Sequence, residues 1–301
     1  MDNVTALSRL STSGVQVAIG PFLVHVRSEL PLVRHYLEVL YADFPIRDEE
    51  GGHFDIQVAA SRGVRRWVRP QANLTVNGER PFLPLPGNLA GALFEWTLNF
   101  CVGREAHRFV AMHAAVVERG GRALIISGES GAGKSTLCAA LVLDGWRLLS
   151  DEFALLDPET GMLSPLPRPV SLKNASIEII RQRGPQMVFG PEGIDIEDAR
   201  FVHMKPPAAS VSRAAEPAMP AVAIFPTWAA GSATSLTPVR HAQVLLRLAD
   251  QSFNYNYLGV RGFDAIVQLA RRVEGYELKY SDIDDALPRL AGLCDSRARP
   301  A

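Results

Sequence analysis

The chain has 301 residues, of which 47% are hydrophobic and 21% charged, and its formal net charge is −1. This length allows one large domain or two ordinary ones, and the composition is typical of a globular protein with a substantial core. The near-neutral charge argues against a nucleic-acid binder. A disulfide framework or a zinc site is not expected from three scattered cysteines, Cys101, Cys138 and Cys294.

The ends and the hydropathy pattern indicate where the protein works. The first residues lack the basic and apolar regions of a signal peptide. No apolar run approaches the length of a membrane span. We therefore expect a cytoplasmic protein without membrane or nucleic-acid partners.

The N-terminal part predicts a small α+β region. Alternating apolar residues around a Gly-Pro turn favour a hairpin over residues 15–26. An apolar stripe at helical spacing predicts a helix over 31–41, and residues 54–58 resemble a strand. Prolines at 81, 84 and 86 suggest a boundary. We predict an N-terminal α+β region over 1–86, suited to acceptor recognition, and a second part over 87–301.

The most informative segment is Gly128–Ser135, which matches G-x-x-x-x-G-K-[ST], the Walker A or P-loop motif, in full. Residues 123–127 before it favour a buried strand, and residues 136–143 after it favour a helix, which is the context this motif needs. Backbone N–H groups and the helix N-terminus would face the phosphates of ATP. Lys134 would reach the β- and γ-phosphates, and the Ser135 hydroxyl would ligate Mg²⁺. The predicted nucleotide-binding residues are Gly128, Glu129, Ser130, Gly131, Ala132, Gly133, Lys134, Ser135 and Thr136.

The segments around the motif favour a mixed sheet. A helix over 88–101 precedes two predicted strands, 109–118 and 122–127, joined by Arg119-Gly120-Gly121. A hairpin that leads directly into the motif differs from the parallel sheets in which most such motifs occur. The predicted fold class is therefore α/β, with a mixed, α+β-like sheet.

The C-terminal half predicts fewer regular elements. Helices are expected over 174–183, 242–248 and 263–272, with a strand over 222–225. Residues 184–219 are rich in Pro, Gly, Ala and Ser, so we expect loops there that could cover a site.

Phosphoryl transfer also needs a carboxylate at the metal and one near the acceptor hydroxyl. Asp151-Glu152 follows the apolar Leu148-Leu149 and precedes another apolar run, which is the place for a Walker-B-like acid. The alternative is an ordinary solvated acidic pair. His113 lies in the strand predicted to pair with the strand before the motif; on its own, such a histidine is more often a core or surface residue.

These motifs occur in one order: Met112-His113-Ala114-Ala115, then Gly128–Thr136, then Gly145–Glu152. The order resembles the catalytic core of the HPr kinase/phosphorylase superfamily, and more closely the HPr-kinase-related group of bacterial kinase-like proteins. Residues 81–86, 95–101 and 252–255 and the pair 262–263 are similar to that group as well.

The resemblance implies a P-loop kinase core like that of phosphoenolpyruvate carboxykinase, with a smaller N-terminal region. It implies ATP and Mg²⁺ as cofactors, with Ser135 and Asp151 at the metal. His113 would lie beside the transferred phosphate, and the catalytic set would be Asp151, His113, Lys134 and Glu152. A homo-oligomer is also in keeping with the group.

Two departures limit the resemblance. The relatives usually have two aspartates where this chain has Asp151-Glu152, so either carboxylate could be the base; we favour Asp151 for metal and base, with Glu152 assisting. Residues 174–207 lack the Gly-rich segment linked to the dephosphorylating reaction, so neither phosphorylase activity nor HPr as substrate is implied. Cations that could neutralise the γ-phosphate or the substrate are Arg168, Lys173, Arg200, His203 and Lys205. An ordinary solvated surface residue is at least as good an interpretation of each, and Arg168 and Lys173 are slightly favoured.

Three functions follow from these patterns. The first is an ATP- and Mg²⁺-dependent kinase that phosphorylates serine in a protein or peptide, for example the precursor peptide of a ribosomally made natural product such as a lasso peptide. The second is a kinase of a small molecule, such as a sugar, polyol or amino acid. The third is a nucleotide sensor or partner-binding protein without catalysis, which has little need for the acidic pair.

Overall fold

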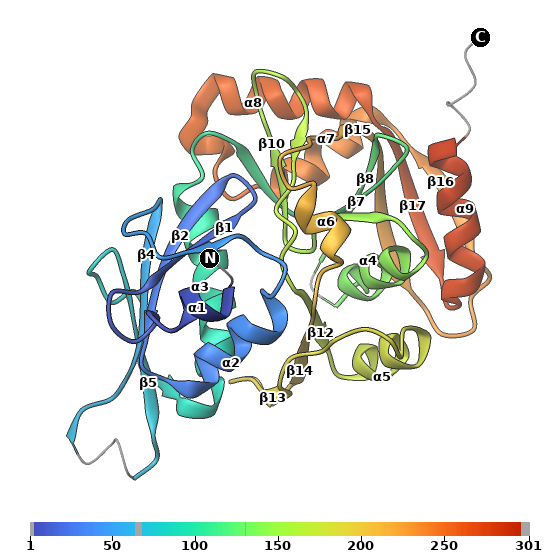
Figure 1. Cartoon of the computed structure of the whole chain (residues 1–301). Helices are drawn as coiled ribbons and strands as arrows, with labels where there is room; N and C mark the ends of the chain where they lie inside the picture. The colour runs from blue at the N-terminus through green and yellow to red at the C-terminus, as the bar shows by residue number, and fades with distance from the viewer. Residues whose placement is uncertain (1–2, 64–67, 130, 296–301) are drawn as a thin grey trace.

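The computed structural model describes residues 3–63, 68–129 and 131–295 and has a mixed α/β fold with three sheets. Figure 1 shows the N-terminal sheet on one side of the molecule and the larger sheet on the other. Among the described residues, no helix combines the length and the apolar character needed to cross a bilayer.

The first sheet has six strands in the order β3-β1-β2-β4-β5-β6. The predicted hairpin is confirmed as β1 (Val15–Ile19) and β2 (Phe22–Ser28), which pair antiparallel. The other strands are β3 (Ile46–Arg47), β4 (Phe54–Ala60), β5 (Gln71–Val76) and β6 (Leu85–Pro86).

Helices cover the face of this sheet that is turned toward the rest of the molecule (Figure 1). They are α1 (Asn3–Leu7), α2 (Pro31–Leu40) and α3 (Ala90–Glu105), the last entered through the 3₁₀ turn η2 (Gly87–Leu89). The predicted helices over 31–41 and 88–101 are thus confirmed. Pro31 suits the first turn of α2 because its missing N–H has no partner there in any helix.

The second sheet has eight strands, seven of them in the order β11-β10-β7-β8-β15-β17-β16, with β9 also paired to β7. Strands β7 (Val110–Arg119) and β8 (Arg122–Ser127) form the predicted antiparallel hairpin. Strand β8 then pairs parallel with β15 (Met219–Trp228), which pairs parallel with β17 (Glu274–Tyr280). The expected mixed sheet is therefore present. The remaining strands are β9 (Arg147–Ser150), β10 (Phe153–Leu156), β11 (Leu163–Ser164) and β16 (Ser235–Val239).

Helices cover both faces of the second sheet (Figure 1). One apolar cluster joins alternate residues of β7 and β8, such as Val117 and Leu124, to α4 (Lys134–Leu143) and α9 (Ile283–Asp295). Another joins the intervening residues, such as Val116 and Ile125, to α7 (His241–Asp250) and α8 (Tyr255–Arg272). Both faces of these strands are buried, which explains why they are continuously apolar in sequence.

The segment 184–219 corrects one prediction, because it is not simply loop. It contains β13 (Gly193–Ile194), β14 (Arg200–Met204) and α6 (Ala208–Ser212), and β15 begins at its end. Strand β14 pairs with β13 and with β12 (Val170–Lys173), which gives the three-stranded sheet beside α5 (Ala175–Arg183). The short apolar run Phe201-Val202 and Met204 is buried there, and its strand pairing was hidden by the surrounding Pro and Gly.

Other elements were missed or were longer than predicted. Strands β16 and β17 and helix α9 had no prediction, and α8 begins eight residues before the predicted 263. The division at residue 86 stays a prediction. One apolar cluster contains N-terminal residues and α3 together with Phe109, Ala111, Phe153 and Leu155 of the second part.

Candidate active site

The motif loop, residues 128–135, leaves the end of β8 and enters α4 at Lys134. Its glycines adopt positive φ angles, +82° at Gly131 and +88° at Gly133, which other residues rarely adopt. Gly133 is also closely approached, since a Cβ atom there would lie 2.7 Å from the Tyr280 hydroxyl oxygen. The glycine pattern is therefore required by both conformation and space. Ser130 lies outside the described residues.

Lys134 is folded back over this loop. Its ammonium group donates hydrogen bonds to the carbonyl oxygens of Gly128 (2.8 Å) and Glu129 (2.9 Å). Burial lowers the pKa of Lys134, while the nearby carboxylates of Glu152 and Asp151 raise it. The loop lysine and the acidic pair, which are separate in sequence, thus share one electrostatic environment.

Asp151 follows β9 at a bend and is only 5% exposed. Its Oδ2 atom accepts a hydrogen bond from the Ser171 N–H at 3.0 Å, whereas Oδ1 has no hydrogen-bond partner of normal geometry in the described part of the chain. Burial, followed by the charge of Glu152, raises the pKa of Asp151 to about 7. The Ser171 N–H, the Ser135 hydroxyl and Lys134 oppose this increase.

The Ser135 hydroxyl oxygen and one carboxylate oxygen of Asp151 are suitable ligands for a hard cation. Mg²⁺ prefers oxygen ligands and is commonly held by one or two protein groups together with substrate phosphates. The Ser135 hydroxyl and Asp151 Oδ1, a buried oxygen without a partner of normal geometry among the described residues, fit that requirement. Within 3–63, 68–129 and 131–295, no cluster of three or more His, Cys, Asp or Glu side chains could hold a metal without such a substrate.

His113 and Glu152 form a second, more accessible pair. His113 Nε2 lies 3.4 Å from Glu152 Oε2, and each side chain is about one third exposed (34% and 33%). The His113 ring stacks on Phe253, with ring centroids 6.0 Å apart. Burial lowers the pKa of His113, and the Glu152 carboxylate partly offsets this effect while Lys134 adds to it.

A series of hydrogen bonds and ion pairs connects Glu152 to polar residues in the interior of the protein. Asn99 Nδ2 donates to Glu152 Oε1 at 3.4 Å, and Asn99 Oδ1 accepts from Arg168. The Arg168 Nε atom lies 3.8 Å from Glu95, which also accepts a hydrogen bond from Tyr41 of the N-terminal region. Glu95 and Asn99 were not predicted as site residues from the sequence. Their signal was two polar residues four apart, on one side of a largely apolar helix.

Four of the suggested cations are engaged elsewhere. Lys173 contacts Asp195 at 2.8 Å, and Lys205 contacts Asp43 at 2.7 Å. Arg200 pairs with two glutamates on an exposed surface. His203 packs against the rings of Tyr36 and Phe201, and its burial lowers its pKa to about 3. Among the five suggested cations, Arg168 is the one that the hydrogen-bonding chain above joins to the acidic pair.

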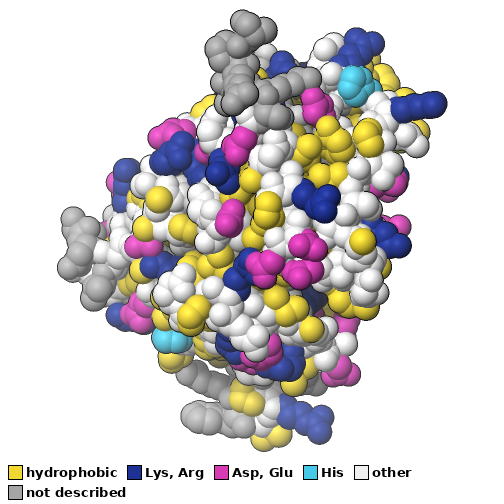
Figure 2. All heavy atoms as spheres, turned by 90° about the vertical axis from the view of Figure 1, so that its right-hand side faces the viewer, with side chains coloured by type: hydrophobic (Ala, Val, Ile, Leu, Met, Phe, Trp, Pro, Cys, Tyr) yellow, Lys and Arg dark blue, Asp and Glu magenta, His cyan; other side chains and the backbone are white. Residues whose placement is uncertain are grey.

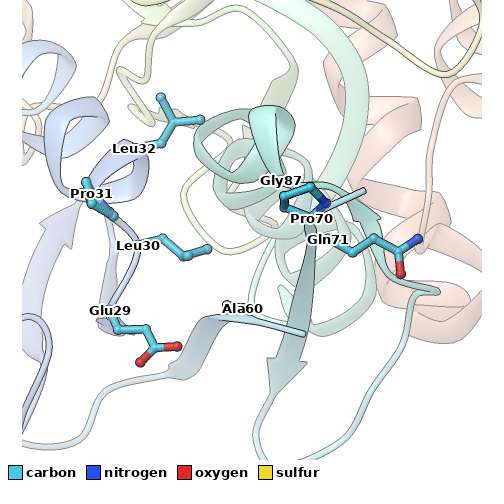
Figure 3. Close-up of a pocket in the computed structure, with 8 residues that line it drawn as sticks. All are labelled: Glu29, Leu30, Pro31, Leu32, Ala60, Pro70, Gln71 and Gly87. Atoms are coloured by element: carbon cyan, nitrogen blue, oxygen red, sulfur yellow. The ribbon is translucent and has the colours of Figure 1, made fainter. Parts of the chain in front are cut away.

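A pocket of about 470 Å³ lies in the N-terminal region, between the start of α2, the end of β4 and the start of β5 (Figure 3). Glu29 and Leu30 line one side and Pro70 and Gln71 the other. None of its lining residues belongs to the motif loop or the acidic pair.

Figure 2 shows the side of the molecule on which α9 lies. Positively and negatively charged side chains are interspersed there with apolar ones.

A weak likeness to known proteins comes from solved structures. No protein-family model and no curated protein matches the chain. Among solved structures, the chain is similar to the Hpr(Ser) kinase/phosphatase from Coxiella burnetii, with 11% sequence identity and a TM-score of 0.26. The match covers 62% of this chain and 98% of that one. A likeness at this TM-score does not decide the function, which depends on the residues of the site itself.

Proposed function

We propose that the protein is a kinase that uses Mg²⁺ and ATP to phosphorylate a serine hydroxyl in a protein or peptide. One observation carries the proposal. Lys134 of the motif loop lies close enough to Asp151 and Glu152 for their charges to act on its pKa. The Ser135 hydroxyl lowers the pKa of Asp151, and this acidic pair reaches the loop from the far side of β7. A phosphate-binding loop and two carboxylates are the minimum that transfer between a triphosphate and a hydroxyl requires.

The loop supplies the binding step. Its N–H groups and the α4 N-terminus would surround the phosphates, and Lys134 would exchange the Gly128 and Glu129 carbonyls for phosphate oxygens. Ser135 and Asp151 would hold Mg²⁺, which when bound neutralises charge on the β- and γ-phosphates. Since a cation favours an ionised ligand, it would also lower the pKa of Asp151 from its value of about 7.

The acceptor side would use Glu152 and His113. In the transfer, a new bond forms between the serine oxygen and Pγ while the bond from Pγ to the ADP oxygen breaks. The serine proton passes to a carboxylate. Asp151 is 5% exposed whereas the Glu152 side chain is 33% exposed, so accessibility favours Glu152 as the base and leaves Asp151 for the metal. This assignment differs from the preference for Asp151 in both roles that the sequence suggested.

An exposed aromatic side chain favours a peptide acceptor over a small molecule. Phe253 stacks on His113 and is 45% exposed, which leaves apolar surface open beside the proposed base. Phe253 also contacts Phe153, with ring centroids 5.2 Å apart. An open aromatic surface suits the side chains that flank a serine in a peptide.

Mass spectrometry tests the proposal directly. The purified protein is incubated with Mg²⁺-ATP and candidate peptides, including small proteins encoded beside its gene, with Asp151→Asn as the matched control. We expect the acceptor to gain the mass of one phosphoryl group with the wild-type protein only. ATP turnover without a modified peptide would instead indicate a small-molecule acceptor. ATP binding without turnover would indicate a sensor.

A further inference from the structure

The topology fixes which side of the motif loop would receive each end of a nucleotide. Strand β8, which leads into the loop, has β7 on one side and β15 on the other. His113 lies on β7, and Asp151 and Glu152 follow β9, which also pairs with β7. A triphosphate whose γ-phosphate faces these groups would therefore direct its nucleoside to the opposite side, over the end of β15.

Trp228 lies at this end of β15. It is the last residue of β15 and is 56% exposed. Its Cβ lies 4.0 Å from the position that a Cβ on Gly133 would occupy, so the residue adjoins the loop. The indole Nε1 donates a hydrogen bond to the Ser281 carbonyl oxygen at 3.2 Å, just beyond the end of β17. The hydrogen bond fixes one edge of the ring, while more than half of the residue's surface remains accessible to solvent.

We infer that Trp228 is the stacking platform for the base of the bound nucleoside triphosphate, an inference that rests on the proposed function. An indole is a large flat surface, and its N–H, held by Ser281, leaves its faces available. Stacking on an aromatic ring tolerates any base because every base has a π-face. Trp228 therefore contributes affinity for the nucleoside without choosing between adenine and guanine.

Two ligands distinguish the contribution of the base to binding from that of the phosphates. A non-hydrolysable ATP analogue carries both, whereas inorganic tripolyphosphate carries only the phosphate chain. Binding of each is measured by calorimetry with Mg²⁺ for the wild type, Trp228→Ala and Trp228→Phe. Leu246→Ala removes another exposed apolar side chain, on α7, and serves as the matched control.

We expect Trp228→Ala to bind the ATP analogue about tenfold more weakly, in keeping with the usual strength of base stacking, and to bind tripolyphosphate as the wild type does. Trp228→Phe should retain most of the affinity, and Leu246→Ala should bind both probes normally. Trp228 fluorescence should also change with the ATP analogue and not with tripolyphosphate. Trp228→Phe identifies that signal among the four tryptophans.

Other outcomes overturn the inference in distinguishable ways. Unchanged binding of the analogue by Trp228→Ala refutes stacking while leaving the proposed kinase intact. An equal loss for both probes means that Trp228 supports the loop and does not contact the base. If the wild type binds neither probe, the proposed function itself fails, and the inference fails with it.

Discussion

Replacing Asp151 by asparagine should make the nucleotide-free protein more stable, and increasingly so as the pH rises. Asp151 is buried, and its pKa in the folded protein is about 7, against 3.8 for an ordinary aspartate. The folded state therefore holds the proton more tightly than the unfolded state. Stability is lost as the pH rises from about 4 to 7, because the buried carboxylate becomes charged. Asparagine keeps an acceptor for the Ser171 N–H and carries no charge.

The size of the effect follows from the two pKa values. Each pKa unit corresponds to 1.36 kcal/mol, so the wild type should be about 4 kcal/mol less stable at pH 8 than if Asp151 were neutral. At pH 5 most of the folded protein is still protonated at this position, and the same calculation gives about 2 kcal/mol. The advantage of Asp151→Asn should therefore grow by about 2 kcal/mol between pH 5 and pH 8.

Urea unfolding of both proteins at several pH values measures this difference. Asp264→Asn, at an exposed position on α8, is the control for exchanging a carboxylate for an amide. Any fixed cost of placing the asparagine amide is the same at each pH, so only the change with pH is diagnostic. A difference between Asp151→Asn and wild type that stays constant from pH 5 to pH 8 would refute the argument. Mg²⁺-ATP should reduce the difference, because a bound cation favours the ionised aspartate.

Four further predictions concern the loop and the acceptor side. Lys134→Ala should abolish ATP turnover and weaken ATP binding in calorimetry, because no other loop side chain can replace its ammonium; normal turnover would contradict the role of the loop. Glu152→Gln should retain ATP affinity but slow transfer by about 10²- to 10⁴-fold, the usual contribution of a general base, and His113→Ala should also slow transfer without changing the urea midpoint. A transfer rate of Glu152→Gln close to wild type would point to Asp151 as the base, and unchanged kinetics of His113→Ala would make it a packing residue. Gly133→Ala should cost about 1–3 kcal/mol of stability, since its φ is +88° and its new Cβ would meet the Tyr280 hydroxyl. Tyr280→Phe in the same protein should recover part of that loss, and a neutral Gly133→Ala would show that the loop adopts another conformation.

Local patterns predicted those elements whose apolar spacing and turn residues agree. The β7–β8 hairpin is an example, because Gly120 and Gly121 take the positive φ angles that its turn requires. Strand β17 was missed although Tyr276, Leu278 and Tyr280 alternate with charged residues, a strand signal visible in the sequence. Strand β14 was harder, because its partners β12 and β13 are themselves short and lie in a Pro- and Gly-rich segment.

In the candidate site, too, residues within a local motif could be predicted and contacts between distant residues could not. The P-loop motif predicted the loop residues, and the order of motifs suggested His113 and Asp151-Glu152. The hydrogen bonds that hold Glu152 could not be predicted in this way. Asn99 reaches Glu152 from α3, and Arg168 reaches Asn99 from a segment after β11, so each contact joins residues more than 50 positions apart. Only the folded packing of α3 against the second sheet brings them together.

Strand β7 lies between β8 on one side and β9 and β10 on the other. This arrangement affects how much sequence change the fold can tolerate. Neighbouring strands lie about 4.8 Å apart, so β8 and β9 are separated by about 10 Å, a spacing set by backbone hydrogen bonds. The gap between the motif loop and the acidic pair therefore does not depend on which apolar side chains fill the core. Helices and loops around these strands can diverge in sequence while the distance between the loop and the two carboxylates stays the same.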